Sequence, residues 1–247
     1  MRVTFLSTSV DILSMTETLN KIDDIIRLGV PTQHVVVNAN KINLMYQDPQ
    51  LRQIVNECPL INADGVSVVL GHRFLGLPEI ERVTGIDLFL NLLGVAEKKG
   101  YKVYFLGATQ QTLKLLLARI NNELPNLKVA GHQHGYFSEK ESNNIAKSIC
   151  QSGADIVFVA FSSPQKEYWI KEYLEMMNAS IVIGVGGSFD VYAGVVKRAP
   201  KTVQKLGLEW LYRFIQEPKR MFKRYFIGNT IFLFHLLKAK LSSMSEK

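Results

Sequence analysis

Short apolar segments alternate with longer segments of helical periodicity over the first 200 residues of the chain. The short segments are rich in Val, Ile and Phe and end at polar or glycine-containing turns, as is typical of buried strands. Regular alternation of such strands with helices predicts an α/β fold with a mainly parallel sheet. The predicted strands are His34–Asn38, Leu60–Ala63, Lys102–Leu106, Leu127–Ala130, Asp155–Ala160 and Ser180–Gly184.

Several predicted helices begin at capping sequences, which supports a Rossmann-like interpretation of the sheet. In a capping box, Ser or Thr at the N-cap is followed three residues later by an acidic residue, and proline fits the first turn of a helix. Because ligands bind beyond the carboxyl ends of parallel strands, the residues that follow each strand are the candidates for function. The capping pairs are Ser14 with Glu17, Thr84 with Asp87, Ser138 with Glu141, and Asp48 with Pro49.

The chain has a net charge of +7, and this charge is unevenly distributed. Residues 1–196 carry 17 Lys and Arg against 19 Asp and Glu, whereas residues 197–247 carry 12 against 3. The alternation of strands and helices also stops near residue 200. We therefore predict an α/β domain over residues 1–200 and a helical, basic C-terminal appendage over residues 201–247.

The basic appendage predicts an anionic partner. Its Lys and Arg alternate with aromatic residues such as Trp210, a combination that suits a helix lying on an anionic membrane. A solvated helix with one packed face is the alternative, and nucleic acid is a weaker one because no nucleic-acid-binding motif accompanies the charge. Arg213, Arg220 and Arg224 are spaced to share a helix face, although Pro218 predicts a break between them.

The cysteine content and the N-terminal residues both predict a cytoplasmic protein. Cys58 and Cys150 cannot form a disulfide framework, and the first residues contain no apolar run long enough for a signal peptide. The longest apolar stretch, Phe226–Leu237, would span about 18 Å as a helix, whereas a bilayer core is about 30 Å thick. We therefore expect no helix that crosses a membrane unaided.

Asp64 follows the predicted strand Leu60–Ala63 and precedes Gly65, so its carboxylate is expected at a strand end. A carboxylate in this position can act as a general base toward a substrate hydroxyl. The residues alone also leave open a role for Asp64 as the cap of the helix that begins at Val66.

Residues 184–190 have the sequence Gly-Val-Gly-Gly-Ser-Phe-Asp and follow another predicted strand. Backbone N–H groups around Gly186 and Gly187 would be able to approach a diphosphate, or the glycines would serve a tight turn. The segment matches neither the dinucleotide-binding G-x-G-x-x-G sequence nor the Walker sequence. Gly107–Gln110, at the start of a predicted helix, is a weaker candidate for nucleotide contact.

His132 and His134 alternate in one loop, but their spacing suggests no third ligand for a metal. The chain also has no D-x-D pair of the kind that chelates a nucleotide-bound divalent ion. We therefore predict no metal site and no cofactor.

Seven short motifs occur in an order and spacing that resemble one known family. In this chain they are Asn62-Ala63-Asp64-Gly65, Glu81–Asp87, Gly135-Tyr136-Phe137, Ser163–Glu167, Gly184–Asp190, Gly194 with Lys197–Pro200, and Leu206–Arg213. Together they resemble the WecG/TagA/CpsF family of glycosyltransferases from about residue 30 to about residue 235.

The resemblance implies a peripheral enzyme at the inner face of the bacterial cytoplasmic membrane, active in cell-surface polysaccharide or teichoic acid synthesis. It implies inverting, metal-independent transfer of a sugar of the N-acetylmannosamine type from UDP to an undecaprenyl-diphosphate-linked amino sugar. In the family motifs, Asp64 corresponds to the proposed general base, and Asn38 and Arg82 correspond to groups that hold the sugar or the diphosphate. The family's C-terminal arginines, proposed to reach over the active site and to touch the membrane, correspond to Arg213, Arg220 and Arg224.

Two positions differ from the family pattern. Val36 stands where some members have a Thr, so a hydroxyl contact is missing. The usual Pro-Lys-Gln-Glu sequence has its Gln and Lys exchanged here, at Gln165 and Lys166. Either Lys166 contacts the nucleotide as a cation, or Gln165 substitutes for the family's Gln.

A non-catalytic, nucleotide-binding scaffold with a membrane-docking tail is the alternative function, and the presence of Asp64 together with Arg82 argues against it. A Rossmann oxidoreductase fits poorly because the dinucleotide fingerprint is absent. The resemblance leaves N-acetylmannosamine, its uronic acid, glucose and galactose as donor sugars. The aromatic helices of the tail also predict self-association, and hence a homo-oligomer, in the absence of membrane.

Overall fold

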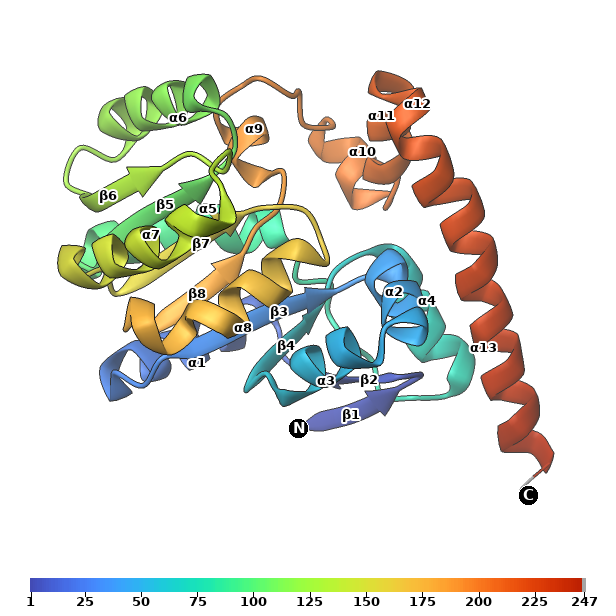
Figure 1. The fold of residues 1–247 in the computed structure, drawn as a ribbon. Helices are drawn as coiled ribbons and strands as arrows, with labels where there is room; N and C mark the ends of the chain where they lie inside the picture. Colours follow the sequence, from blue (N-terminus) through green and yellow to red (C-terminus); the bar gives the residue numbers. More distant parts are fainter. Residues whose placement is uncertain (246–247) are drawn as a thin grey trace.

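The computed structural model describes residues 1–245, apart from the side chains of residues 205, 220, 223, 224, 244 and 245. It confirms the α/β class, with a six-stranded parallel sheet flanked by helices (Figure 1). The strands are β1 (Arg2–Phe5), β2 (Thr8–Asp11), β3 (Thr32–Val37), β4 (Leu60–Ala63), β5 (Lys102–Gly107), β6 (Lys128–Gln133), β7 (Ile156–Ala160) and β8 (Ile181–Gly184). The helices of the body are α1 (Met15–Leu28), α2 (Ala39–Gln47), α3 (Pro49–Glu57), α4 (Val66–Leu75), α5 (Gly85–Lys99), α6 (Gln110–Glu123), α7 (Glu139–Ser152), α8 (Gln165–Met177) and α9 (Ser188–Tyr192). The C-terminal helices are α10 (Lys201–Lys205), α11 (Glu209–Gln216), α12 (Pro218–Phe222), the π-helical η1 (Lys223–Ile227) and α13 (Gly228–Ser245).

The main sheet has the strand order β4-β3-β8-β7-β5-β6, and every neighbouring pair is parallel. All six predicted strands are present, with ends that differ by up to a few residues. The largest differences are at β3, which begins at Thr32 and ends at Val37, and at β6, which continues to Gln133. β3 ends early because Asn38 leaves the strand to cap α2.

The predicted capping residues occupy the predicted places. Ser14 caps α1, where its Oγ accepts a hydrogen bond from the backbone of Glu17 at 3.2 Å, and the Glu17 carboxylate accepts one from the Ser14 backbone at 2.7 Å. Thr84, Ser138 and Asp48 are the N-caps of α5, α7 and α3. Local sequence therefore sets where these helices begin.

A hairpin of β1 and β2, which the sequence did not predict, packs against β4. The guanidinium of Arg2 donates to both carboxylate oxygens of Asp11 at 2.8 Å. The same carboxylate accepts from the backbone N–H of Ile61 in β4 at 2.8 Å. Neither strand is a continuous apolar run, and the Leu6-Ser7 turn between them contains no glycine, so the sequence carries no clear signal for the hairpin.

Side chains of the sheet alternate between two helix layers. On β5, Val103 and Phe105 pack with α1, α5, α6 and α9, whereas Tyr104 and Leu106 pack with α7 and α8. Both layers are visible on either side of the sheet in Figure 1. Because each face is buried, the strand ends that carry the candidate residues are held by apolar packing on two sides.

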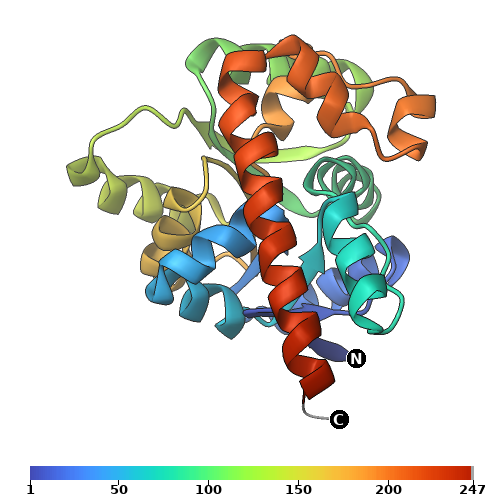
Figure 2. The same ribbon diagram turned by 90° about the vertical axis from the view of Figure 1, so that its right-hand side faces the viewer.

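The C-terminal helix α13 packs along α2 and α4 on the outside of the body (Figures 1 and 2). Phe232 and Leu236 are 1% and 5% exposed, and they share an apolar cluster with Phe5 of the hairpin. A Cβ added at Gly71 of α4 would lie 2.8 Å from Phe5 and 3.1 Å from Leu236, so a glycine is needed where α13 passes α4. This helix of the predicted appendage is therefore part of an apolar core.

The helices α10, α11 and α12 lie over the carboxyl end of the sheet (Figure 1). Glu217 separates α11 from α12, which begins at Pro218, and this confirms the predicted break. Among the described residues, no helix combines the length and the apolar character needed to span a bilayer.

Candidate active site

Asp64 and Asn38 stand side by side where β4 and β3 end. The two strands are parallel, with Val37 paired to Ala63, and the backbone N–H of Asp64 donates to the carbonyl of Val37 at 2.7 Å. A Cβ added at Gly65 would lie 3.7 Å from the Cβ of Asn38. The structure thus brings together two residues that are 26 positions apart in the sequence and were both predicted to serve the site.

Asn38 is the N-cap of a helix, whereas Asp64 lies one position before an N-cap. Asn38 is the N-cap of α2, and its Oδ1 accepts from the backbone N–H of Lys41 at 3.0 Å. Its amide NH₂ group is a donor, which this cap does not use. Gly65, with φ +102°, occupies the N-cap position of α4, so Asp64 precedes the position that the capping interpretation gave it.

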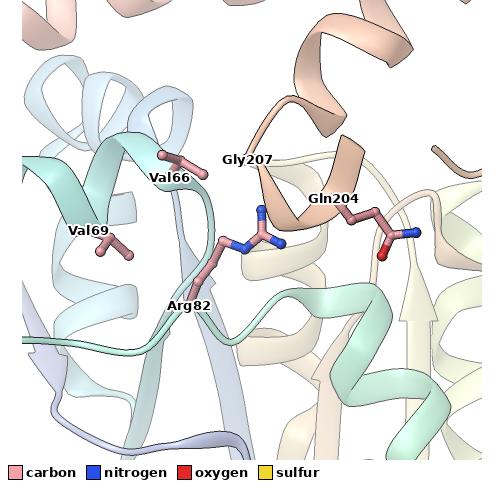
Figure 3. A pocket seen from close by; sticks show the side chains of 5 residues that line it. All are labelled: Val66, Val69, Arg82, Gln204 and Gly207. Atoms are coloured by element: carbon pink, nitrogen blue, oxygen red, sulfur yellow. The ribbon is translucent and has the colours of Figure 1, made fainter. Parts of the chain in front are cut away.

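Arg82 reaches the same end of the sheet from the loop between α4 and α5. This loop is tied to β4 because the backbone N–H of Val83 donates to the carbonyl of Ala63 at 2.9 Å. The Arg82 side chain extends toward the turn between α10 and α11 (Figure 3). There it lines a pocket of about 210 Å³ together with Val66, Val69, Gln204 and Gly207.

Arg213 lies against the glycine loop that follows β8. A Cβ added at Gly187 would be 2.8 Å from Nη2 of Arg213, so the guanidinium occupies space that a side chain at this position would fill. Gly186 has φ +54°, in the left-handed region that favours glycine. The Nε of Arg213 is buried and finds no hydrogen-bond partner among the described residues. Arg213, which follows the predicted boundary near residue 200, therefore meets the loop of Gly186 and Gly187, which precede it. All three residues were predicted to bind substrate.

Arg198 connects the segment that carries Arg213 to the body. Its Nη2 lies 2.7 Å from Oδ1 of Asp87 in the first turn of α5, and its Nε donates to Oε1 of Glu209 in α11 at 3.2 Å. Burial alone would lower the pKa of the Arg198 guanidinium, but Asp87 and Glu209 hold it above its ordinary value. We call these three residues the Arg198 bridge.

A buried charge cluster lies beneath the ends of β3 and β8. Oε1 of Glu167 is 2.6 Å from Nζ of Lys41 and 2.9 Å from Nζ of Lys166, and all three side chains are at most 9% exposed. Burial alone would raise the pKa of Glu167, but the two lysines hold it below its ordinary value. Two cations and one anion give the cluster a net positive charge.

Lys166 borders the glycine loop, whereas Gln165 is exposed at the start of α8. A Cβ added at Gly184 would lie 2.7 Å from Cε of Lys166, and Nζ of Lys166 donates to Oγ of Ser163. Gln165 is exposed at the first position of α8. The arrangement thus places a lysine, rather than a glutamine, against the loop.

The structure adds less about the other candidates of the sequence. The side chains of Arg220 and Arg224 lie outside the described residues. In the part of the chain that the structure describes, no three His, Cys, Asp or Glu side chains are grouped so as to hold a metal ion. Burial raises the pKa of the Cys58 thiol to about 12, which makes it a poor nucleophile.

Sequence reasoning missed Lys41, Glu167 and Arg198 as parts of the site. Glu167 and Arg198 belong to the quoted motifs, but a motif does not show which partners a side chain has. Lys41 follows Asn38 by three positions in α2, and its sequence context predicts an ordinary exposed lysine. The structure shows that it is buried beside Glu167. Only long-range packing reveals a buried ion pair.

The site as a whole offers a carboxylate beside a side-chain amide, with cationic groups on two sides. Asp64 can accept a proton from a hydroxyl. Arg82, Arg213 and the backbone N–H groups near Gly187 can stabilise the charge of a diphosphate. This set of groups suits transfer of a group from a diphosphate to a hydroxyl.

Comparisons with known proteins agree with this chemistry. The model of the "Glycosyl transferase WecG/TagA/CpsF family" matches residues 3–246. A Bacillus spizizenii protein named N-acetylglucosaminyldiphosphoundecaprenol N-acetyl-beta-D-mannosaminyltransferase is 35% identical over 174 residues, which cover 70% of this chain and 67% of the relative. A Bacillus subtilis protein of the same name is 37% identical over 174 residues, with the same coverage.

Proposed function

This chain belongs to the WecG/TagA/CpsF family of glycosyltransferases, and from that premise we propose that it transfers N-acetylmannosamine from UDP to N-acetylglucosaminyl-diphosphoundecaprenol. The names of the two Bacillus relatives support the transferred sugar and the acceptor. Family membership favours an enzyme over the alternative of a non-catalytic scaffold. The donor nucleotide follows from the resemblance of the motifs, and the reaction belongs to cell-wall polymer synthesis.

The observation that carries the mechanism is the pairing of Asp64 with Asn38 at the ends of two adjacent strands. Asp64 takes the proton from the acceptor hydroxyl as its oxygen attacks the anomeric carbon of the donor. The new glycosidic bond forms on the face opposite to the breaking bond, and UDP leaves with that electron pair. Attack from the opposite face inverts the anomeric configuration.

The departing diphosphate requires positive groups. Arg213 beside Gly187 supplies a guanidinium and backbone donors at the end of β8, and Lys166 adds the positive charge of the buried cluster. Donors that are already in place cost no reorganisation as charge develops on the leaving group. Asn38 and Arg82 hold the sugar and the acceptor diphosphate on the other side of Asp64.

The tail is proposed to hold the enzyme at the inner face of the cytoplasmic membrane, where a polyprenyl-linked acceptor lies. Large apolar side chains are exposed along its helices, including Ile215 at 70%, Phe222 at 53% and Phe234 at 65%. They occur among basic residues, as in helices that lie on anionic membranes. Sedimentation with anionic liposomes measures this association.

Replacement of the proposed base tests the reaction. Asp64→Asn is expected to lower turnover by at least about a hundredfold, because general base catalysis contributes roughly 10²–10⁴. Binding of UDP, measured by calorimetry, should stay near the wild-type value. Asp24→Asn, which removes an exposed carboxylate from α1, is the matched control. Transfer by Asp64→Asn within twofold of wild type would overturn the assignment.

A further inference from the structure

Helix α4 carries apolar side chains on both its inner and its outer face. Val68, Gly71 and His72 face inward and are buried against the body. On the outer face, Leu70 is 55% exposed and Phe74 is 45% exposed. Exposed apolar residues at helical spacing on an enzyme surface mark a contact with an apolar ligand or partner when they form a continuous patch.

This outer face runs directly into the pocket beside the active site. Val66 and Val69 form the pocket wall on the α4 side, and Arg82 lies opposite with its guanidinium toward Gly207 (Figure 3). A Cβ added at Gly207 would be 2.6 Å from Cγ2 of Val66, so the turn after α10 closes one end of the pocket tightly. The pocket thus combines two valine side chains with one cation and the amide of Gln204.

Asp64 lies just before the helix that lines the pocket. Asp64 is two residues before Val66, so the pocket begins beside the proposed base and α4 leads away from it. From Val66 to Phe74, the outer face of the helix extends over about 12 Å, at 1.5 Å per residue. The proposed base Asp64, the guanidinium of Arg82 and the apolar outer face of α4 therefore follow one another in this order.

We propose that the outer face of α4 binds the first isoprenyl units of the acceptor lipid. Arg82 pairs with the acceptor diphosphate, Val66 and Val69 contact the first isoprenyl unit, and Leu70 and Phe74 contact the next ones. The order sugar, diphosphate, isoprenoid in such an acceptor matches the order base, guanidinium, apolar path in the protein. This subsite rests on the proposed function, since it presumes a polyprenyl-diphosphate-linked acceptor.

The helix α13 packs on the inner face of α4 and meets this path at Phe74. Nζ of Lys240 lies 5.8 Å from the centre of the Phe74 ring, and Leu236 packs against Gly71. In Figure 2, α13 runs beside α4 along its length. A lipid chain on α4 would therefore be guided toward the exposed apolar residues of α13.

The test compares two water-soluble acceptors in the absence of membrane or detergent. Both carry N-acetylglucosamine diphosphate, one on a single isoprenyl unit and the other on three units. For the wild type, kcat/KM is expected to be roughly tenfold or more higher with three units, since each added apolar group in a fitted pocket favours binding. Val69→Ser and Phe74→Ser should reduce this preference to less than about threefold and leave the KM of the UDP-sugar unchanged.

Leu115→Ser is the matched control, because Leu115 is 41% exposed on α6, whose buried side chains belong to a different apolar cluster from those of α4. It should keep the full preference, and thermal unfolding should show that all three variants remain folded. If Val69→Ser and Phe74→Ser keep the wild-type preference, the subsite is overturned while the proposed function stands.

If no transfer is detected, direct binding tests the isoprenyl subsite separately from the proposed function. Farnesyl diphosphate, titrated by calorimetry, should bind the wild type more tightly than Val69→Ser or Phe74→Ser by roughly fivefold or more. Equal binding by all three proteins would overturn the subsite. Absence of transfer by the wild type to either acceptor would overturn the proposed function, and the binding result would still decide whether α4 recognises an isoprenyl diphosphate.

Discussion

The two parts of the basic C-terminal segment are attached to the body in different ways. α13 is attached by apolar burial, with Phe232 and Leu236 inside the cluster that contains Phe5. α11 has no buried residue and is connected through the Arg198 bridge, whose side chains are 19–34% exposed. Apolar burial contributes more to stability than partly exposed ion pairs do.

The difference in attachment suggests different roles for α13 and α11. A helix that completes a core is expected to unfold only with the body, whereas a segment held by a few polar contacts opens at a lower free energy. α11 also carries Arg213, which lies at the glycine loop. We infer that α13 fixes the segment in place and that α11 is the part able to adjust around a substrate.

The division of the chain near residue 200 stays a proposal, and truncation there would combine two effects. Truncation after Pro200 would remove Phe232 and Leu236, and so expose the cluster around Phe5. A loss of activity in that variant would mix unfolding with loss of membrane contact. Single substitutions separate the two effects.

The largest expected effect is on the stability of the attachment of α13. Phe232→Ala should lower the free energy of unfolding by about 3–5 kcal/mol, because it removes a buried aromatic side chain and leaves a cavity. Denaturant unfolding measures the change. Phe234→Ala, on the same helix at 65% exposure, should change stability by less than about 0.5 kcal/mol.

The same pair of variants sharpens the comparison on membranes. Phe234→Ala should reduce sedimentation with anionic liposomes because its ring is proposed to contact the lipid. Equal stability of the Phe232→Ala and wild-type proteins would show that α13 is not part of the core. The membrane proposal would be overturned if sedimentation with anionic liposomes were unchanged both in Phe234→Ala and in a double variant of Ile215 and Phe222.

Acid should destabilise the body through a buried histidine. His34 of β3 is buried, its Nε2 lies 2.9 Å from Oδ1 of Asn62, and burial lowers its pKa to about 4. Between about pH 6.5 and pH 4, the unfolded chain binds a proton at His34 that the folded chain does not bind. The free energy of unfolding therefore falls as the pH falls, by about 2 kcal/mol between pH 7 and pH 5 from this group.

Denaturant unfolding at pH 7 and pH 5 measures this dependence. His34→Gln replaces the titrating ring by a neutral amide, so the variant should lose about 2 kcal/mol less than the wild type over this interval. An identical pH dependence in both proteins would mean that His34 does not control acid stability.

The smallest expected effect is at the Arg198 bridge, and it should appear in catalysis rather than in stability. Arg198→Ala should lower kcat/KM by about tenfold, because a small displacement of a group at the site reduces the rate. The free energy of unfolding should change by less than about 1 kcal/mol. Arg73→Ala, which removes an exposed ion pair with Glu79, is the control. Unchanged kcat/KM would show that α11 keeps its position without the bridge.

The sequence by itself determined the parts of the fold that depend on local physical chemistry. Periodicity located the six strands of the parallel sheet, since burial on both faces makes them continuous apolar runs. Capping pairs such as Ser14 with Glu17 located helix starts, because their hydrogen bonds join residues three positions apart. Asp64 was placed correctly at a strand end for the same local reason.

Only the tertiary structure decided which distant residues meet. The packing of the β1–β2 hairpin on β4, the pair of Lys41 with Glu167 and the Arg198 bridge all join segments whose contact has no local signal. Net charge described the tail as one basic segment, but packing divided it, since Phe232 is buried and Phe234 on the same helix is exposed. Local hydrogen bonds and periodicity are written along the chain, whereas burial and ion pairing depend on what the folded chain places beside each side chain.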